Sequence, residues 1–383
     1  MTNWYDKTYK FLLIIPAIIL VVSLIYLAGF YNQNGDIIRK DVSLTGGTTI
    51  SVFDENVDIE ELERVVGNEI PDLTVREISD FRTGRQKGFF VETVESAERI
   101  KEVLEDYLGY ELNQDNSSVE FTGATLSSGF YQQLRGSIIA AFLLMAWVVF
   151  LIFSESPTIK AATTMLTFLG IRLALPEIKI ITSLAGIMMI LGLAYGLIRK
   201  GGLRESRWFK IIAAISLLLF FFYPAYWLLL PTIVVLLAFY TIYSIPSLAV
   251  ILSAFADITM TVAVVNMLGI DLSIAGIIAF LMLIGYSVDT DILLTSRLIK
   301  RKEGDVNKKM FEALKTGTTM TITSIVAIAI SLLVIYNFSG ILRQIFTILL
   351  IGLGFDLINT WCSNAGILKL YIEKKRRARE WED

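Results

Sequence analysis

Four aspartates stand inside long apolar stretches of the sequence, where a charged side chain is costly to bury: Asp257, Asp289, Asp291 and Asp356. An ionisable group at the centre of a membrane span costs roughly 2.5–3.5 kcal/mol on insertion scales, so such groups usually face the interior of a helix bundle and mark an ion or proton path. A carboxyl group that has lost its water also holds a proton more tightly. The four aspartates are therefore candidates for proton coupling within a membrane.

The rest of the composition leaves little room for other chemistry. Histidine is absent from the 383 residues, which removes the usual general base and the commonest metal ligand. The single cysteine, Cys362, excludes a disulfide framework and a cysteine metal cluster within the chain. Any proton chemistry must therefore use carboxylates, and we expect no metal, no cofactor, no enzymatic activity and no nucleic-acid partner.

Asp289 and Asp291 are too close in sequence to face the same helix interior. Residues two apart on a helix point about 200° apart. Asp289 shares a face with Gly285 and Ser296, and small residues let another helix approach closely. Asp291 could instead lie at the cytoplasmic interface, shortly before Arg297. We therefore favour Asp289 as the working carboxylate of the two.

Hydroxyl groups that could accompany a membrane carboxyl occur in the stretch KTGTTMTITS. The candidates for this supporting polar layer are Thr318, Thr319, Thr321 and Thr323. At 1.5 Å per residue, Asp289 and Asp356 lie on the order of 20–25 Å below the outer surface, a depth similar to that of these threonines. A hydroxyl can satisfy a carboxyl group in either protonation state. The alternative is that each threonine bonds its own helix backbone. Asp257 lies nearer the bilayer centre, where a structural hydrogen-bonding role is the alternative.

The elements that must position these residues are membrane helices. Hydrophobic residues make up 54% of the chain and come in blocks of about twenty, the length that spans a bilayer. The pattern predicts an α-helical polytopic membrane protein of about ten spans. The predicted spans are residues 11–30, 137–153, 159–176, 180–198, 209–223, 226–243, 247–269, 272–295, 318–336 and 341–368. The segment 159–176 carries Arg172 and could be a surface helix, which leaves eight or nine spans as the alternative.

Charge predicts the orientation of these spans. Residues 31–136 hold ten basic and twenty-one acidic residues, whereas the other polar segments are basic. Short basic loops stay in the cytoplasm, and a long domain can be translocated whatever its charge, so we expect residues 31–136 outside and both termini in the cytoplasm. The predicted parts are an N-terminal segment with the first span (1–30), the outer domain (31–136), the second span (137–153), an inserted hydrophobic region of four spans (154–244), a four-span bundle (245–370) and a basic tail (371–383).

The outer domain follows a recognisable order of elements. Alternating stretches such as GGTTISVF and GFFVETV predict strands, and DIEELERVVGNEI predicts a helix capped by Asp58. A second helix begins at Ser96. The order strand-helix-strand-strand-helix-strand predicts a single extracytoplasmic α+β domain of ferredoxin-like type.

Three stretches carry a resemblance to a known family. DVSLTGGT resembles a Gly-Gly-Thr signature at the entry to the outer domain, residues 245–301 end in a Gly-Tyr-Ser motif with its aspartate, and ALKTGTTMTITS resembles the start of the following span. On these stretches the chain is similar to SecF proteins of archaeal type, in the SecD/SecF family of protein-export membrane proteins within the resistance-nodulation-division superfamily. The motif residues are Gly46, Gly47, Thr48, Gly285, Tyr286 and Ser287.

This resemblance implies assistance to polypeptide export through the SecYE channel of the cell membrane, driven by the proton motive force. It also implies SecD, an unfolded exported polypeptide and the lipid bilayer as partners. Asp289 matches the aspartate of SecD-like motifs, and Asp257 matches the family's aspartate on the preceding span. The chain departs from the family at two places. Thr318 and Thr319 stand where bacterial members have an arginine, and residues 154–244 replace a short turn.

Three other functions fit parts of the pattern. A small-molecule or lipid exporter of the same superfamily is the main alternative, although such exporters normally have two large outer domains in one chain. An intramembrane aspartyl protease would need a Gly-x-Gly-Asp motif. The stretch GLGFD, which ends at Asp356, has the wrong spacing because a phenylalanine separates its second glycine from the aspartate. A purely structural membrane scaffold would make Asp289 dispensable except for stability.

Overall fold

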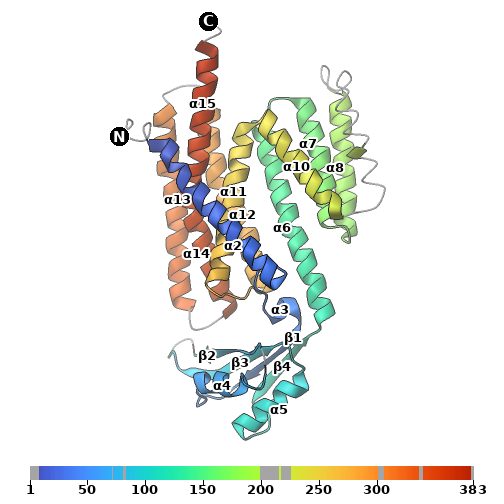
Figure 1. Ribbon diagram of the computed structural model, residues 1–383, viewed down its shortest axis with the longest axis vertical. Coiled ribbons are helices and arrows are strands. Elements are labelled where there is room, and N and C mark those ends of the chain that lie inside the picture. The colour runs from blue at the N-terminus through green and yellow to red at the C-terminus, as the bar shows by residue number, and fades with distance from the viewer. Residues whose placement is uncertain are drawn as a thin grey trace.

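A helical body carries one small antiparallel sheet at its end. The computed structural model describes residues 8–70, 72–80, 83–198, 215–216, 226–300, 306–335 and 340–380. The sheet and its two helices lie at the end of the molecule opposite both termini (Figure 1). This arrangement agrees with a polytopic helical protein that has a single small α+β part.

Six helices in the described part of the chain are long and apolar enough to cross a membrane. They are Thr8–Asn34, Leu126–Phe153, Ile245–Met267, Ile274–Ile299, Val306–Ile335 and Gly340–Arg377. Two shorter apolar helices, Lys179–Leu193 and Leu229–Tyr243, lie in the region predicted to hold four spans. The predicted span 209–223 falls almost entirely outside the described residues. The count of ten spans therefore stays a prediction.

The main bundle is built from helical segments near the C-terminus, with one N-terminal helix across them (Figure 1). Its elements are α2 (Ile14–Asn34), α11 (Ile245–Met267), α12 (Ile274–Ile299), α13 (Val306–Ile335), α14 (Gly340–Ile358), the π-helical η2 (Asn359–Asn364) and α15 (Ala365–Glu380). Two apolar clusters hold it together. One contains Val262, Leu283 and Leu349, and the other contains Leu294 and Leu368. On α11, α12 and α14, the residues that lie between the two clusters include the polar side chains described below.

A second group of helices packs beside the bundle, over α6 (Ala124–Phe153). Its other members are α7 (Pro157–Ala174), α8 (Lys179–Ile198), the short 3-10 helix η1 (Tyr226–Leu228) and α10 (Leu229–Tyr243). Helix α7 is buried on nearly all sides, and Trp147 Nε1 of α6 donates to Thr164 Oγ1 of α7 at 2.8 Å. The sequence predicted this region as an insertion, and here it forms a compact apolar unit with α6.

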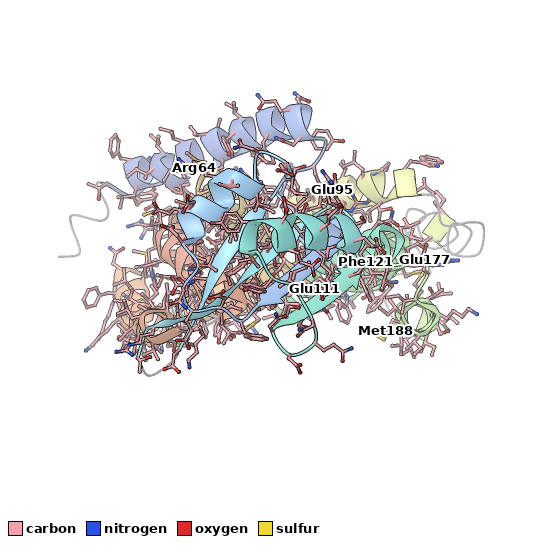
Figure 2. The ribbon with its side chains drawn as sticks, turned by 90° about the horizontal axis from the view of Figure 1, so that it is seen from below. Arg64, Glu95, Glu111, Phe121, Glu177 and Met188 are labelled. Atoms are coloured by element: carbon pink, nitrogen blue, oxygen red, sulfur yellow. The ribbon has the colours of Figure 1, made fainter. Side chains whose placement is uncertain are left out.

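The sheet contains β1 (Gly47–Val52), β2 (Thr74–Ser79), β3 (Gln86–Thr93) and β4 (Ser117–Thr122), in the spatial order β2-β3-β1-β4. All neighbouring strands are antiparallel. Helices α4 (Ile59–Val66) and α5 (Ala97–Leu108) cover one face, where Ile50 and Phe89 are fully buried. The predicted caps are confirmed, since Asp58 accepts from Glu60 N and Ser96 accepts from Arg99 N. Figure 2 shows this part from below, with Arg64 on α4 far from Met188 on α8.

Helix α6 begins earlier than the predicted second span. The prediction placed the start at residue 137, whereas the helix starts at Ala124, directly after β4. The extra turns contain Gln132, Gln133 and Arg135, which are too polar for a hydropathy pattern but compatible with a helix. The strand therefore passes into the span without a loop.

A short extended segment ties the sheet to the bundle. Residues 37–41 run beside the loop between α11 and α12, where Leu272 N donates to Arg39 O at 2.9 Å and Asp41 N donates to Leu272 O at 3.0 Å. Asn266 Nδ2 at the end of α11 donates to Ile37 O at 2.7 Å. The entry to the domain is thus held by the ends of α11 and α12 nearest the sheet.

Candidate functional site

Three of the four aspartates meet inside the bundle. Asp257 on α11, Asp291 on α12 and Asp356 on α14 have 0%, 0% and 1% of their side-chain surface exposed. Close helix packing brings them together, because Gly352 of α14 lies against Leu283 of α12. A Cβ atom at position 352 would come within 2.3 Å of a Leu283 methyl group. The three carboxyl groups therefore form one polar layer between the two apolar clusters of the bundle.

Asp257 has a donor for each of its carboxylate oxygens. Ser287 Oγ of α12 donates to Oδ2 at 2.5 Å, and Asn359 Nδ2 of η2 donates to Oδ1 at 2.6 Å. Ser287 is the last residue of the Gly-Tyr-Ser motif, which gives this motif residue a concrete hydrogen-bonding function. Asp257 is thus the best satisfied of the three carboxyl groups.

Asp291 and Asp356 share a hydroxyl group. Thr360 Oγ1 of η2 lies 2.9 Å from Asp291 Oδ1 and 3.2 Å from Asp356 Oδ1. Asn364 Nδ2 also donates to Asp291 Oδ1, at 2.7 Å. Asp356 has two further hydroxyl neighbours, with Thr290 Oγ1 at 3.1 Å from Oδ1 and Thr321 Oγ1 at 3.5 Å from Oδ2. The two carboxyl groups are therefore linked through one threonine.

The cluster contains fewer hydrogens than its contacts require. Thr360 has one hydroxyl hydrogen, so it can donate to only one of the two carboxyl groups, and the other contact needs a hydrogen on the carboxyl itself. Two buried amide oxygens, Asn359 Oδ1 and Asn364 Oδ1, have no hydrogen-bond donor among the described residues, whereas the buried Ser253 hydroxyl lies beside Asp291. In the same described part, no lysine or arginine forms an ion pair with these aspartates. A proton on Asp291 or Asp356 would supply the hydrogen that the shared Thr360 contact lacks.

The expectation that Asp289 faces the bundle interior is wrong, and Asp291 takes that place. Asp289 is exposed on the outer side of α12, together with Tyr286 and Gly285, which has no neighbouring atom within 4 Å of a built Cβ. The argument from small residues identified a face that another helix could approach. No described helix of this chain lies there. The role of Asp289 in proton coupling stays a prediction.

The predicted threonine layer contributes one member to the cluster. Thr321 is buried and reaches Asp356. Thr319 and Thr323 are exposed and donate to the backbone of α13, to Lys315 O and Thr319 O, each at 2.7 Å. They follow the alternative that threonines near a helix start bond their own backbone. Thr318 is half-buried and has no side-chain contact with the three carboxyl groups among the described residues.

Sequence reasoning missed the polar side chains of η2. Asn359, Thr360 and Asn364 are all buried and all contact the aspartates. The sequence contained a sign of them, because the polar stretch NTWCSN begins three residues after Asp356 inside an apolar block. Thr290, between the two aspartates of α12, was also missed.

The Gly-Gly-Thr motif has a structural role at the entry of the sheet. A Cβ atom at Gly47, whose φ is 151°, would lie 2.3 Å from Thr93 O. Gly46 N donates to Val42 O at 2.8 Å and ends the short helix α3 (Val42–Thr45). Thr48 Oγ1 is buried and donates to Glu95 O at 2.7 Å. These contacts fix the start of β1 against the end of β3.

No group of three or more Asp, Glu, Cys or His side chains in the described ranges is arranged to hold a metal ion. The donor set of the aspartate layer is carboxyl, hydroxyl and amide. Such groups can bind protons and form hydrogen bonds.

Comparisons with known proteins identify a family for this helical bundle with its small sheet. Residues 213–374 match the family model described as protein export membrane protein SecD/SecF, C-terminal. The protein-export membrane protein SecF of Methanocaldococcus jannaschii is 31% identical over 378 residues, which is 97% of this chain and 98% of that protein. SecF of Pyrococcus furiosus is 39% identical over 188 residues, 49% of this chain and 56% of the relative.

A solved structure shares the fold. The crystal structure of SecDF, a translocon-associated membrane protein from Thermus thermophilus, aligns with a TM-score of 0.53 at 14% identity over 97% of this chain. The chain spans 38% of that longer protein. The class is thus a SecD/SecF-type protein-export membrane protein. Within that class, the chain belongs to the SecF family, which confirms the resemblance stated from its motifs.

Proposed function

We propose that the chain is the SecF subunit of a SecDF-type complex that assists protein export through the SecYE channel and is driven by the proton motive force. The observation that carries this proposal is the buried layer of Asp257, Asp291 and Asp356, whose contacts lack hydrogens. Gain or loss of a proton there changes the charge between three packed helices. Moving one charge through 100 mV supplies about 2.3 kcal/mol, which biases a two-state element by more than tenfold.

Hydrogen bonds at the outer ends of the same helices connect the aspartate layer to the sheet. The loop after α11 bonds the segment 37–41, and Gln344 of α14 bonds Ser273 Oγ and the backbone of Asp271. The helices that carry the aspartates therefore also hold the entry of the domain. A shift between α11, α12 and α14 would be transmitted to the position of the sheet, which could alternately hold and release an emerging polypeptide.

A SecD-type protein is the proposed membrane partner. The chain spans 38% of the solved SecDF chain, so most of such an assembly would come from another protein. The exposed position of Asp289 supports a membrane partner. An exposed carboxylate within a membrane span is costly unless another protein or water contacts it. The relatives reported above are named for protein export, which favours this function over the small-molecule or lipid exporter.

The finer topology is also part of the proposal. We infer ten spans, a ferredoxin-like outer domain at residues 31–136 and cytoplasmic termini, in the cell membrane. The strand order β2-β3-β1-β4 with two helices on one face supports the ferredoxin-like assignment. The position of both termini opposite the sheet supports the orientation (Figure 1).

Export measurements with the assembled complex test the function. The change is Asp291→Asn or Asp356→Asn, and the readout is transport of a labelled precursor into inverted vesicles with and without an imposed proton gradient. We expect both variants to lose the gradient-dependent increase while transport without a gradient stays the same. Asp106→Asn on α5, far from the bundle, is the matched control. Full stimulation by the gradient in both site variants would contradict the proposal.

A further inference from the structure

The last long apolar helix is interrupted at the aspartate layer. Helices α14 and α15 are joined by the π-helical segment η2, Asn359–Asn364, and together they form one continuous apolar helix from Gly340 to Arg377. π-Helical turns are rare, occur mostly as single-turn bulges within α-helices and are frequent at functional sites. The segment therefore marks a place where a regular helix would fail to position the side chains.

The π-helical geometry brings three polar side chains to one face. In an α-helix with 3.6 residues per turn, positions 359 and 364 would point about 140° apart. The i→i+5 spacing of a π-helix places these two residues one above the other. Asn359 accordingly reaches Asp257 at 2.6 Å and Asn364 reaches Asp291 at 2.7 Å, with Thr360 between Asp291 and Asp356. The structure thus places the three polar side chains of η2 against the aspartate layer.

We infer that η2 is the positioning element of the aspartate layer and that the Thr360 hydroxyl passes a proton between Asp356 and Asp291. This inference deepens the proposed function, since it assumes that the aspartate layer is the coupling site. The oxygen of Thr360 lies within hydrogen-bond distance of one oxygen on each carboxyl group. Asn364 holds Asp291 beside Thr360, and Asn359 anchors the start of η2 to Asp257.

The transfer balances as a paired movement of two hydrogens. The carboxyl hydrogen of Asp356 passes to Thr360 Oγ1 while the hydroxyl hydrogen of Thr360 passes to Asp291 Oδ1. Asp356 becomes a carboxylate, Asp291 becomes a neutral carboxyl, and Thr360 remains a neutral hydroxyl with its hydrogen on the other side. The net result is one proton moved from α14 to α12, so the charge changes helix without crossing solvent.

Few titratable groups lie near the Thr360 hydroxyl. They are Asp257 on α11, Asp291 on α12, Asp356 on α14 and the half-buried Cys362 within η2, while α13 contributes the uncharged Thr321. The infrared band of each carboxyl group can therefore be assigned with the asparagine variant of that residue. Infrared spectroscopy separates them, because a protonated carboxyl has a C=O stretching band that a carboxylate or an amide lacks.

The test compares Thr360→Val, which keeps the shape and removes the hydroxyl, with Thr360→Ser, which restores it. Thr323→Val is the matched control, since Thr323 is exposed and bonds only its own helix. The full chain with its SecD-type partner is titrated in lipid nanodiscs, and Asp291→Asn and Asp356→Asn assign the bands. We expect the two carboxyl bands of the unmodified protein to titrate as a coupled pair and Thr360→Val to make them titrate independently.

Export gives the second readout. We expect Thr360→Val to lower the gradient-dependent export rate by about tenfold, roughly what loss of one charge-assisted hydrogen bond supports, and Thr360→Ser to recover it. Thr360→Ala serves as the second variant where the valine does not fold. Coupled bands that persist without the hydroxyl overturn the inference. If Asp291→Asn and Asp356→Asn leave export unchanged, the proposed function fails, and the band coupling still decides the role of Thr360.

Discussion

The three buried aspartates differ in how well the protein satisfies them. Asp257 has two donors, one for each oxygen, whereas Asp291 and Asp356 share the single hydroxyl hydrogen of Thr360. A buried contact that lacks its hydrogen is costly, so Asp291 and Asp356 gain most from a proton between them. We therefore place the proton exchange at this pair and give Asp257 the more structural role.

Removal of Asp291 should destabilise the chain, whereas removal of Asp289 should not. Asp291→Ala would remove the side-chain acceptor of the buried Asn364 amide, at a cost of roughly 1–3 kcal/mol, while Thr360 keeps Asp356 as an acceptor. Asp289→Ala changes only an exposed side chain. Thermal unfolding of the chain alone in detergent measures the difference. Equal losses of stability in the two variants would show that the Asp289 side chain is packed, contrary to its exposed position on α12.

Two acidic residues near the domain entry predict a dependence of stability on pH. Burial raises the pKa of Asp41, and burial raises the pKa of Glu92, although Arg76 at 3.7 Å partly opposes the second shift. A raised folded pKa means that the folded state binds the proton more tightly than the unfolded chain. The stabilisation is therefore complete below the unfolded pKa and is lost as pH rises through the folded pKa.

Glu92→Gln should remove part of this pH dependence. We expect the unfolding temperature of the unmodified protein to fall as pH rises from acidic values through the folded pKa of Glu92, and the variant to show a flatter profile. Glu102→Gln, on the exposed surface of α5, is the control. Parallel profiles for the unmodified protein and Glu92→Gln would refute the assignment.

At the residue level, sequence reasoning selected aspartates inside apolar blocks, and three of them, Asp257, Asp291 and Asp356, lie together in the bundle. The expectation that Asp289 faces the interior was wrong because small residues show that a helix could approach, without showing whether that helix belongs to the same chain. The amides of η2 were missed because periodicity analysis assumes 3.6 residues per turn, and a π-helical turn breaks that assumption.

The segment that joins the sheet to the bundle should open independently of the sheet. Asn266 bonds Ile37 O at 2.7 Å and accepts from Arg39 N at 3.4 Å, and each such bond contributes roughly 0.5–1.5 kcal/mol. Asn266→Leu removes both. We expect hydrogen exchange of residues 37–41 to become about tenfold faster, while the amides of β1 and β3 keep their rates.

The control for this experiment is Asn34→Leu, because the Asn34 amide bonds only Phe30 O of its own helix. Faster exchange throughout the sheet in Asn266→Leu would mean that the domain and its attachment open as one unit. That outcome would remove the independent joint through which a movement of α11 and α12 is transmitted.

At the level of elements, the outer domain was more predictable than the membrane region. Its strands alternate and its helices carry caps at Asp58 and Ser96, so local chemistry determines each element. The start of α6 was not predictable from hydropathy, since the helix begins outside the apolar block. In the region 154–244 the apolar length alone could not show how the helices pack, and α7 is buried by its neighbours on nearly all sides.

The whole molecule should cross the membrane with the sheet outside. In a Cys362→Ser background, cysteine is introduced at Glu98 on α5 or at Lys374 on α15, both exposed positions. A membrane-impermeant maleimide added to intact cells should label position 98 and leave position 374 unlabelled until the membrane is opened. The reverse pattern would invert the topology, and with it the direction in which a proton gradient could drive the aspartate layer.

The exposed face of α12 should bind the SecD-type partner. It consists of Ile278, Met282, Gly285, Tyr286 and Asp289, which recur at helical spacing on the side away from the buried cluster. Gly285 leaves space for a close helix contact, so Gly285→Phe should fill that space and lower the amount of partner recovered with the solubilised chain by about tenfold.

The matched control is Ile187→Phe on α8, an exposed apolar position in the second helix group that should leave partner recovery unchanged. Unfolding of each variant alone in detergent checks that the chain itself is intact. A partner that stays bound to Gly285→Phe but is lost from Ile187→Phe would move the interface to the inserted helices. The exposed carboxylate of Asp289 would then lack a protein neighbour, and the membrane face of α12 would need a second copy of this chain or water to meet it.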